Sequence, residues 1–101
     1  MKTLSIIIPV YNEAKTVDLI LKKVSAAAIG NVKKEIIAVD DGSTDGTSEI
    51  LKHWENQCRI LYHRKNSGKG AAIKTALPFA KGDYVIIQDA DLEYDPADWQ
   101  K

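Results

Sequence analysis

The stretch LSIIIPVYNE, residues 4–13, is an apolar run that passes directly into polar residues. Ile and Val in succession, without polar alternation, are typical of a strand buried on both faces of a parallel sheet. Three further runs have strand character, so strands are predicted at residues 4–10, 35–39, 59–63 and 84–88. The first stretch therefore predicts one strand of a parallel β-sheet.

Helical patterns separate these runs. Val17, Ile20, Leu21 and Val24 follow the i, i+3, i+4, i+7 spacing of one buried helix face. Two shorter patterns follow, the first made of Ile50, Leu51 and a core Trp54, the second of Ala72, Ile73, Ala76 and Leu77, ending near Pro78 and Gly82. Alternating strands and helices predict an α/β fold, a three-layer α/β/α domain with right-handed crossovers and a mostly parallel sheet of strand order 3-2-1-4.

Composition excludes several classes of function. A chain of 101 residues makes one small domain, and its formal net charge of zero gives no general attraction to nucleic acid. Cys58 is the only cysteine, which excludes an internal disulfide and a cysteine-rich zinc site. His53 and His63 lack metal-ligand spacing, so both are expected at the surface or at a sheet edge. The first apolar run ends in polar residues, unlike a signal peptide, and we expect a cytoplasmic location.

Residues 95–98, Asp-Pro-Ala-Asp, have the pattern of a helix start, with a capping side chain and a proline in the first turn. Only three residues follow, too few for a stable helix. We therefore expect the chain to be the front part of a longer protein.

Polar residues follow three predicted strands, at residues 9–13, 40–46 and 89–93. Ligands of parallel α/β sheets bind outside the carboxyl ends of the strands, where strand order reverses, and order 3-2-1-4 brings these three loops to one crevice. Each loop also has a purely structural explanation: a turn and helix cap at 40–46, a helix start at Asn12 and Glu13, and an ordinary acidic loop at Asp89 and Asp91. Together, however, they concentrate negative charge, which costs stability unless a cation binds.

Asp89, Asp91, Glu93 and Asp95 occupy every second position after the last strand. Hard divalent cations such as Mg²⁺ and Mn²⁺ prefer carboxylate oxygens, and Mg²⁺ commonly bridges one or two of them to substrate phosphates. The pattern therefore predicts a metal that in turn holds a diphosphate. Asp95 fits the helix cap better than the metal.

Residues 64–70, RKNSGKG, supply positive charge after the third strand. The glycines allow backbone N–H groups to approach a ligand, and Lys69 precedes a helix N-terminus, which favours anions. Arg64 and Lys65 also fit a solvated loop edge. The spacing matches neither the Walker phosphate loop nor the dinucleotide-binding fingerprint.

The four strand ends carry PVYNE, VDDGSTDGT, NSGKGAAI and DADLEYDP in that order. These motifs resemble those of the family 2 inverting glycosyltransferases, which have the GT-A fold, and are most similar to those of dolichol-phosphate or polyprenyl-phosphate sugar synthases. The resemblance covers essentially all of the chain. It implies that residues 1–101 are the nucleotide-sugar-binding half of a GT-A domain, truncated at the C-terminus.

The resemblance implies a role for each matching residue. Those expected around the nucleotide of a UDP- or GDP-sugar are Pro9, Tyr11 and Glu13 at the nucleoside, Val39 and Asp41 at the base, Asp40 as a support of the loop, and Lys69. Asp89, Ala90 and Asp91 would form the D-x-D motif. Asp91 would be the firmest ligand of Mg²⁺ or Mn²⁺, with Asp89 and Glu93 completing the metal shell.

The resemblance also implies an activity, transfer of a hexose with inversion to an acceptor such as a polyprenyl or dolichyl phosphate. A metal held by Asp91 would stabilise the leaving diphosphate. Family members are longer, and their second half supplies the acceptor site and any catalytic base. We therefore expect this chain to be inactive alone and to self-associate through uncovered apolar surface. The parent enzyme is expected at the cytoplasmic face of a membrane.

Two other classes of function are alternatives to a glycosyltransferase. A phospho-acceptor signalling domain needs paired acids after the first strand and a lone Asp after the third, where this chain has PVYNE and His63-Arg64-Lys65. A non-catalytic nucleotide-binding or interaction module, which keeps only the fold, is the second alternative and stays open at this point.

Overall fold

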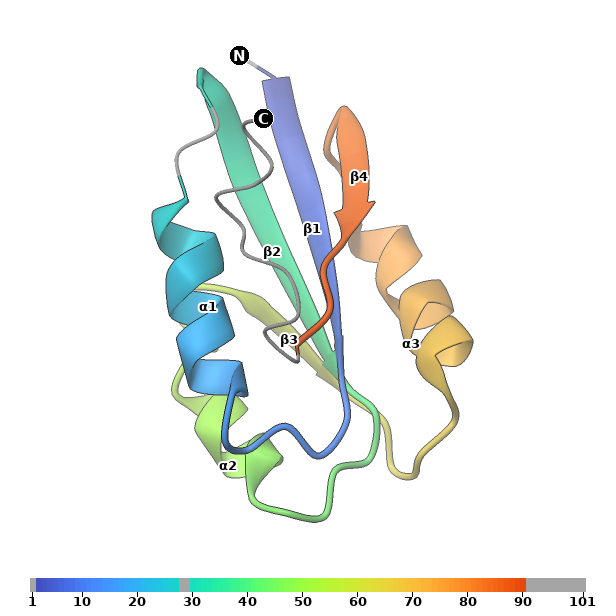
Figure 1. Ribbon diagram of the computed structural model, residues 1–101. Coiled ribbons are helices and arrows are strands. Elements are labelled where there is room, and N and C mark those ends of the chain that lie inside the picture. The colour runs from blue at the N-terminus through green and yellow to red at the C-terminus, as the bar shows by residue number, and fades with distance from the viewer. Residues whose placement is uncertain (1, 28–29, 91–101) are drawn as a thin grey trace.

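The computed structural model describes residues 2–27 and 30–90 and shows a four-stranded parallel sheet flanked by helices (Figure 1). In chain order the elements are β1 Lys2–Val10, α1 Val17–Ala26, β2 Val32–Asp40, α2 Thr47–Lys52, β3 Arg59–Tyr62, α3 Lys69–Ala76, the 3₁₀ turn η1 Leu77–Phe79 and β4 Tyr84–Ile87. The strands lie in the order β3-β2-β1-β4, which confirms the predicted α/β class and strand order. The predicted helix start at residues 95–98 lies outside the described residues.

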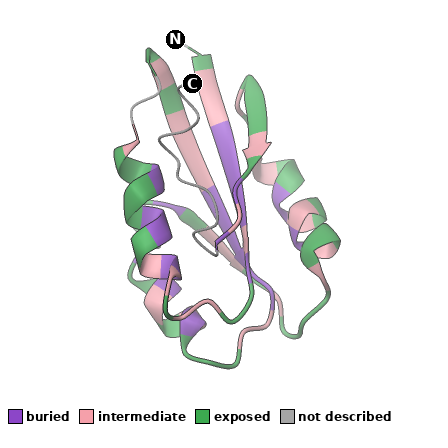
Figure 2. Ribbon diagram, in the orientation of Figure 1, coloured by how far each residue is buried: buried purple, intermediate pink, exposed green. Residues whose placement is uncertain are grey.

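The sheet separates two apolar cores. On one face α1 and α2 pack against β1, and this core includes Ile6, Ile8, Val10, Val17, Ile20, Leu21, Val24 and Leu51. On the other face α3 contributes the buried side chains of Ala72 and Ala76, which lie with Ile7, Ile37 and Val39, and the partly buried Ile73 packs against them. Successive residues of β1 therefore serve opposite faces, as the period of a strand requires. Figure 2 shows the buried residues of each helix facing the sheet. The predicted three-layer arrangement is confirmed.

β4 is an edge strand of the described sheet and exposes Tyr84, Val85 and Ile87, so its apolar run is not buried on both faces as that of β1 is. Two sequence predictions need correction. Leu77, predicted on a buried helix face, is 48% exposed, since α3 ends at Ala76 and the chain turns through η1. Trp54 is buried as predicted, but it follows the end of α2 instead of lying on that helix.

β2 begins at Val32, earlier than the predicted residue 35, and therefore includes Lys34. The side chain of Lys34 stabilises the end of α1. The Lys34 ammonium donates to the carbonyls of Val24, Ser25 and Ala27, at 2.8, 2.6 and 2.6 Å. These are carbonyls of the last turn of α1, which lack helical partners and carry the negative end of the helix dipole.

Among the described helices, none is long and apolar enough to cross a bilayer.

Candidate functional site

The loop after β1 is fastened to the loop after β2. Asn12 adopts a left-handed conformation, φ 51°, which lets its side chain accept from Thr44 N at 2.7 Å while its own N–H donates to Ser43 Oγ at 2.9 Å. Glu13 N donates to Thr47 Oγ1 at 3.0 Å. Glu13 O also accepts from Thr16 N at 3.0 Å and from Val17 N at 2.8 Å, in the turn that leads into α1. Asn12 therefore joins two strand-end loops, and Glu13 takes part both in this contact and in the entry to α1.

The acids of the loop at residues 40–46 differ in the loops that they contact. Asp40 accepts from Ser43 N at 3.1 Å and from the Ser48 hydroxyl, and Asp45 accepts from Thr47 N at 3.1 Å. For Asp40 the turn-and-cap explanation holds, because its bonds stay within its own loop and the start of α2. Asp45 also accepts from Ala14 N at 3.2 Å, and so reaches the loop that follows β1. Asp41 instead leaves its loop and reaches the one that follows β3.

Asp41 is 3% exposed and its carboxylate is held by three donors. Ser67 N donates to Oδ1 at 2.9 Å, Gly68 N donates to Oδ2 at 2.8 Å, and His63 Nδ1 lies 2.7 Å from Oδ1. Burial would raise the pKa of Asp41, but the hydrogen bonds from His63 and from the two amides together lower it below its ordinary value of 3.8. Asp41 is therefore a buried carboxylate that stays ionised at neutral pH.

Gly42 permits this contact between loops. A Cβ at Gly42 would lie 2.4 Å from the carbonyl carbon of Lys65 and 2.6 Å from Asn66 N, and the backbone there has φ +74°. Only glycine accepts both the left-handed conformation and the approach of a second backbone.

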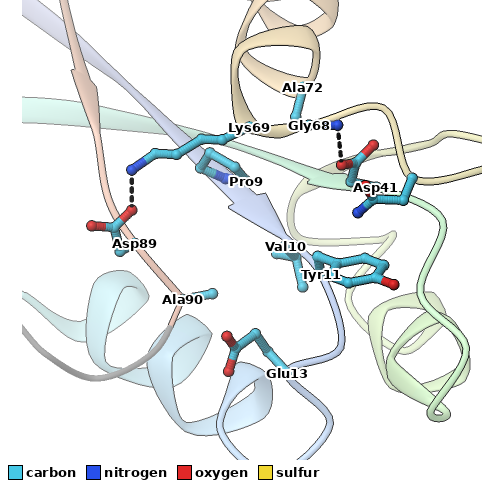
Figure 3. Close-up of a pocket in the computed structure, with 11 residues that line it drawn as sticks. Pro9, Val10, Tyr11, Glu13, Asp41, Gly68, Lys69, Ala72, Asp89 and Ala90 are labelled. Carbon is cyan, nitrogen blue, oxygen red and sulfur yellow. Dashed lines mark hydrogen bonds and ion pairs between the residues drawn. The ribbon is translucent and has the colours of Figure 1, made fainter.

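A pocket of about 260 Å³ opens where the three strand ends and the start of α3 meet (Figure 3). It is lined by Pro9, Val10, Tyr11, Glu13, Asp41, Asn66, Gly68, Lys69, Ala72, Asp89 and Ala90. The Lys69 ammonium and Asp89 Oδ1 form an ion pair of 2.7 Å, drawn as a dashed line in Figure 3. The pocket therefore combines an exposed aromatic ring at Tyr11, three carboxylates and a cation.

Most of the residues predicted for the nucleotide meet at this pocket, namely Pro9, Tyr11, Glu13, Asp41, Lys69, Asp89 and Ala90. Val39 and Asp40 do not line it, because both are buried in the sheet and its adjoining turn, at 0% and 2% exposure. Asp91 and Glu93 lie outside the described residues. Among the residues that the structure describes, no group of three or more acids, histidines or cysteines is placed to hold a metal.

His63 was missed as a site residue on the sequence. His53 is exposed as expected, but the His63 side chain is only 16% exposed and lies between Asp41 and Thr75. Its position as the last residue of the third predicted strand, residues 59–63, is the available signal, since residues at the carboxyl ends of the strands share the crevice. Asn66 and Gly68 also line the pocket, and both belong to the RKNSGKG segment, whose glycines allow backbone N–H groups to approach a ligand.

Comparison with known proteins gives the family. Residues 5–101 match the model of Glycosyl transferase family 2. The undecaprenyl-phosphate 4-deoxy-4-formamido-L-arabinose transferase of Aeromonas hydrophila is 38% identical over 102 residues, an alignment that covers 95% of this chain and 31% of that protein. The chain thus spans less than a third of the length of this relative.

Two solved structures share the fold. The mannosyltransferase PcManGT of Pyrobaculum calidifontis, in complex with GDP-Man and Mn²⁺, has a TM-score of 0.79 and 32% identity over 87% of this chain and 27% of its own. S. aureus TarS 1–349 in complex with UDP has a TM-score of 0.77 and 32% identity over 90% of this chain and 28% of its own. With its parallel sheet of order 3-2-1-4 and its motifs at the strand ends, the chain belongs to glycosyltransferase family 2 and has the GT-A fold.

Proposed function

We propose that this chain forms the donor-nucleotide half of a glycosyltransferase that moves a sugar from a UDP- or GDP-sugar to a polyprenyl or dolichyl phosphate, with inversion. The observation that carries the proposal is the pocket at the strand ends, where the buried, ionised Asp41 lies beside Tyr11, Lys69 and Asp89. The named function of the Aeromonas relative supports a polyprenyl phosphate as acceptor. The UDP and GDP-Man complexes of the two structural relatives support a nucleotide donor and leave its base open.

The pocket suits a nucleoside better than a complete nucleotide sugar. At about 260 Å³ it lies just under the ~300–1,000 Å³ of most small-molecule sites, so part of the donor would extend beyond it. Tyr11, 44% exposed, offers a ring face on which a base can stack. Asp41 offers a fixed acceptor for a ring N–H. Pro9 and Glu13 line the wall between these two residues and Asp89.

A divalent metal, Mg²⁺ or Mn²⁺, fits the donor set of Asp89, Asp91 and Glu93, because all three offer the hard oxygen ligands that these ions prefer. Asp89 is the described member of the set. Its carboxylate is one-third exposed at the pocket and pairs with the Lys69 ammonium, which supports the proposal of a cation at this position. When bound there, the metal supplies Lewis-acid stabilisation of the charge that develops on the leaving diphosphate.

Lys69 adds to that stabilisation from the protein. Its ammonium lies at the first residue of α3, where the backbone N–H groups and the helix dipole also favour an anion. In the structure it pairs with Asp89. A diphosphate that enters the pocket would compete with Asp89 for Lys69, and the displaced carboxylate would then be available to the metal.

The proposal assigns the acceptor site to protein outside this chain. Less than a third of the Aeromonas relative is matched. The edge strand β4 exposes Tyr84, Val85 and Ile87, at 57%, 43% and 42%, and a further part of the protein or a second copy of the chain would bury this surface. The 101-residue chain alone is therefore expected to bind donor without transferring the sugar.

The experiment compares two proteins, this chain and the product of any open reading frame that continues beyond Lys101. Each is incubated with UDP- or GDP-linked hexoses, Mn²⁺ and undecaprenyl phosphate, and the glycolipid is measured by mass spectrometry. We expect product from the longer protein, loss of product in its Asp91→Asn variant, and none from the chain alone. Nucleotide binding without transfer by either protein would favour the non-catalytic module. Transfer by the chain alone would refute the assignment of the acceptor site.

A further inference from the structure

The contacts around His63 bear on which base the pocket accepts, a question that rests on the proposed function. The imidazole is held at both nitrogens, with Asp41 Oδ1 2.7 Å from Nδ1 and Thr75 Oγ1 2.8 Å from Nε2. Because the Asp41 carboxylate is ionised and can only accept, Nδ1 must carry the proton and donate it. Thr75 belongs to α3, the helix that begins with Lys69, so the ring links the Asp41 loop to this helix.

The hydrogen bonds of Asp41 limit what it can offer a ligand. A carboxylate has about four acceptor positions, two on each oxygen. Ser67 N and Gly68 N are consecutive amides that occupy one position on each oxygen, and His63 occupies the second position on Oδ1. At most one position is left, and it is on Oδ2.

The number of acceptor positions left on Asp41 distinguishes uracil from guanine, the bases of the two candidate donors. Guanine presents a ring N–H and an adjacent amino group side by side, a pair of donors that needs both oxygens of a carboxylate. In Asp41 the two oxygens are already bridged by the amide pair, and the other acceptor position of Oδ1 is taken by His63. Uracil presents one ring N–H between two carbonyls and needs a single acceptor. A guanine bound to Asp41 would leave one donor unpaired, which is costly in a desolvated site.

We propose that His63 is a specificity-determining residue of the nucleobase subsite, which orients Asp41 to accept one N–H through Oδ2 and so selects uridine over guanosine diphosphate. His63 acts through Asp41 and is a positioning residue. Its effect should fall on recognition of the base and spare the ribose and diphosphate.

The test is calorimetric titration of the protein, at fixed Mn²⁺, with UDP, GDP and ribose 5-diphosphate, which lacks a base. The wild type should bind UDP more tightly than GDP by about tenfold, the typical effect of one unpaired buried donor. His63→Leu should weaken UDP binding by about tenfold and reduce the preference for UDP, because a charge-assisted hydrogen bond is lost and Oδ1 is released. Ribose 5-diphosphate should bind all variants alike.

Two further variants act as controls. His63→Asn places an amide N–H near the position of Nδ1 and should restore the preference for UDP. His53→Leu removes the exposed histidine after α2, outside the pocket, and should change no affinity.

Three results would overturn the inference. If His63→Leu weakens ribose 5-diphosphate as much as UDP, His63 only supports the fold. If the wild type binds GDP as tightly as UDP, the count of acceptors does not govern the base, although the proposed function stands. If a folded sample binds no nucleotide at all, the inference and the proposed function both fail.

Discussion

Gly42 is the position at which a single methyl group should separate the loops that build the pocket. In a Gly42→Ala variant the new Cβ would lie 2.4 Å from the carbonyl carbon and 2.7 Å from Cα of Lys65, both backbone atoms that cannot turn aside. The loop after β3 must then move away from β2. Since Ser67 N and Gly68 N belong to that loop, their bonds to Asp41 should lengthen or break.

The magnitude follows from two contributions. A left-handed residue with a side chain costs about 1–2 kcal/mol, and forcing an extra methyl group into a packed contact costs about 1–3 kcal/mol. Gly42→Ala should therefore lower the free energy of unfolding by about 2–5 kcal/mol, against the total of about 5–15 kcal/mol of an ordinary domain. For a domain of this size, each kcal/mol lowers the melting temperature by about 4–8 °C.

Gly46→Ala is the matched control. Gly46 is also left-handed, φ +96°, but a Cβ there has no neighbour within 4 Å. Gly46→Ala should lower the free energy of unfolding by the backbone cost alone, about 1–2 kcal/mol, and leave nucleotide affinity unchanged. Urea denaturation and titration with UDP measure both effects. Equal destabilisation by the two substitutions, with equal nucleotide affinity, would refute the view that contact between the loops after β2 and β3 shapes the site.

Three further predictions follow. Lys34→Met should lower the free energy of unfolding by about 1–3 kcal/mol through the loss of its bonds to the end of α1, whereas the exposed Lys33→Met should change little in the same urea titration. Because the pKa of Asp41 is lowered in the folded protein, the ionised carboxylate stabilises the fold. This contribution is complete above pH 3.8, the ordinary pKa, and is lost as the pH falls below that value. The difference in unfolding free energy between wild type and Asp41→Asn should accordingly shrink below pH 3.8, and a difference independent of pH would contradict the assignment. Lys69→Met should change stability by less than about 1 kcal/mol, since its pair with Asp89 is largely solvated, yet weaken diphosphate binding, unlike Lys74→Met on the same helix.

The fold could be predicted from the sequence because its signals are local. The Ile- and Val-rich runs and the helical spacing between them are enough to give a parallel sheet, and the strand-end loops then point to one crevice. Errors arose where the environment of a segment decides its burial. The apolar residues of β4 look like those of β1, but β4 has no neighbour on its outer side among the described strands.

The candidate site was predicted in part, for a related reason. The sequence shows that Asp40, Asp41 and Asp45 share a loop, but not which of them reaches the loop after β3. That choice depends on amides of residues 67 and 68, which are distant in sequence, and on the absence of a side chain at Gly42. His63 shows the same limitation, because the partners of its side chain come from the loop after β2 and from α3, and no local spacing indicates them.

The central claim is that the strand-end pocket binds a nucleoside diphosphate together with a divalent cation. The most direct measurement is the melting temperature of the protein with UDP or GDP in Mn²⁺ or in EDTA, for wild type, Asp41→Asn and Asp91→Asn. At about 100 times the dissociation constant, a bound nucleotide adds about 2.7 kcal/mol of stability. We expect a stabilisation that requires the metal and is lost in both variants. A folded protein that neither nucleotide stabilises, with or without metal, would contradict it.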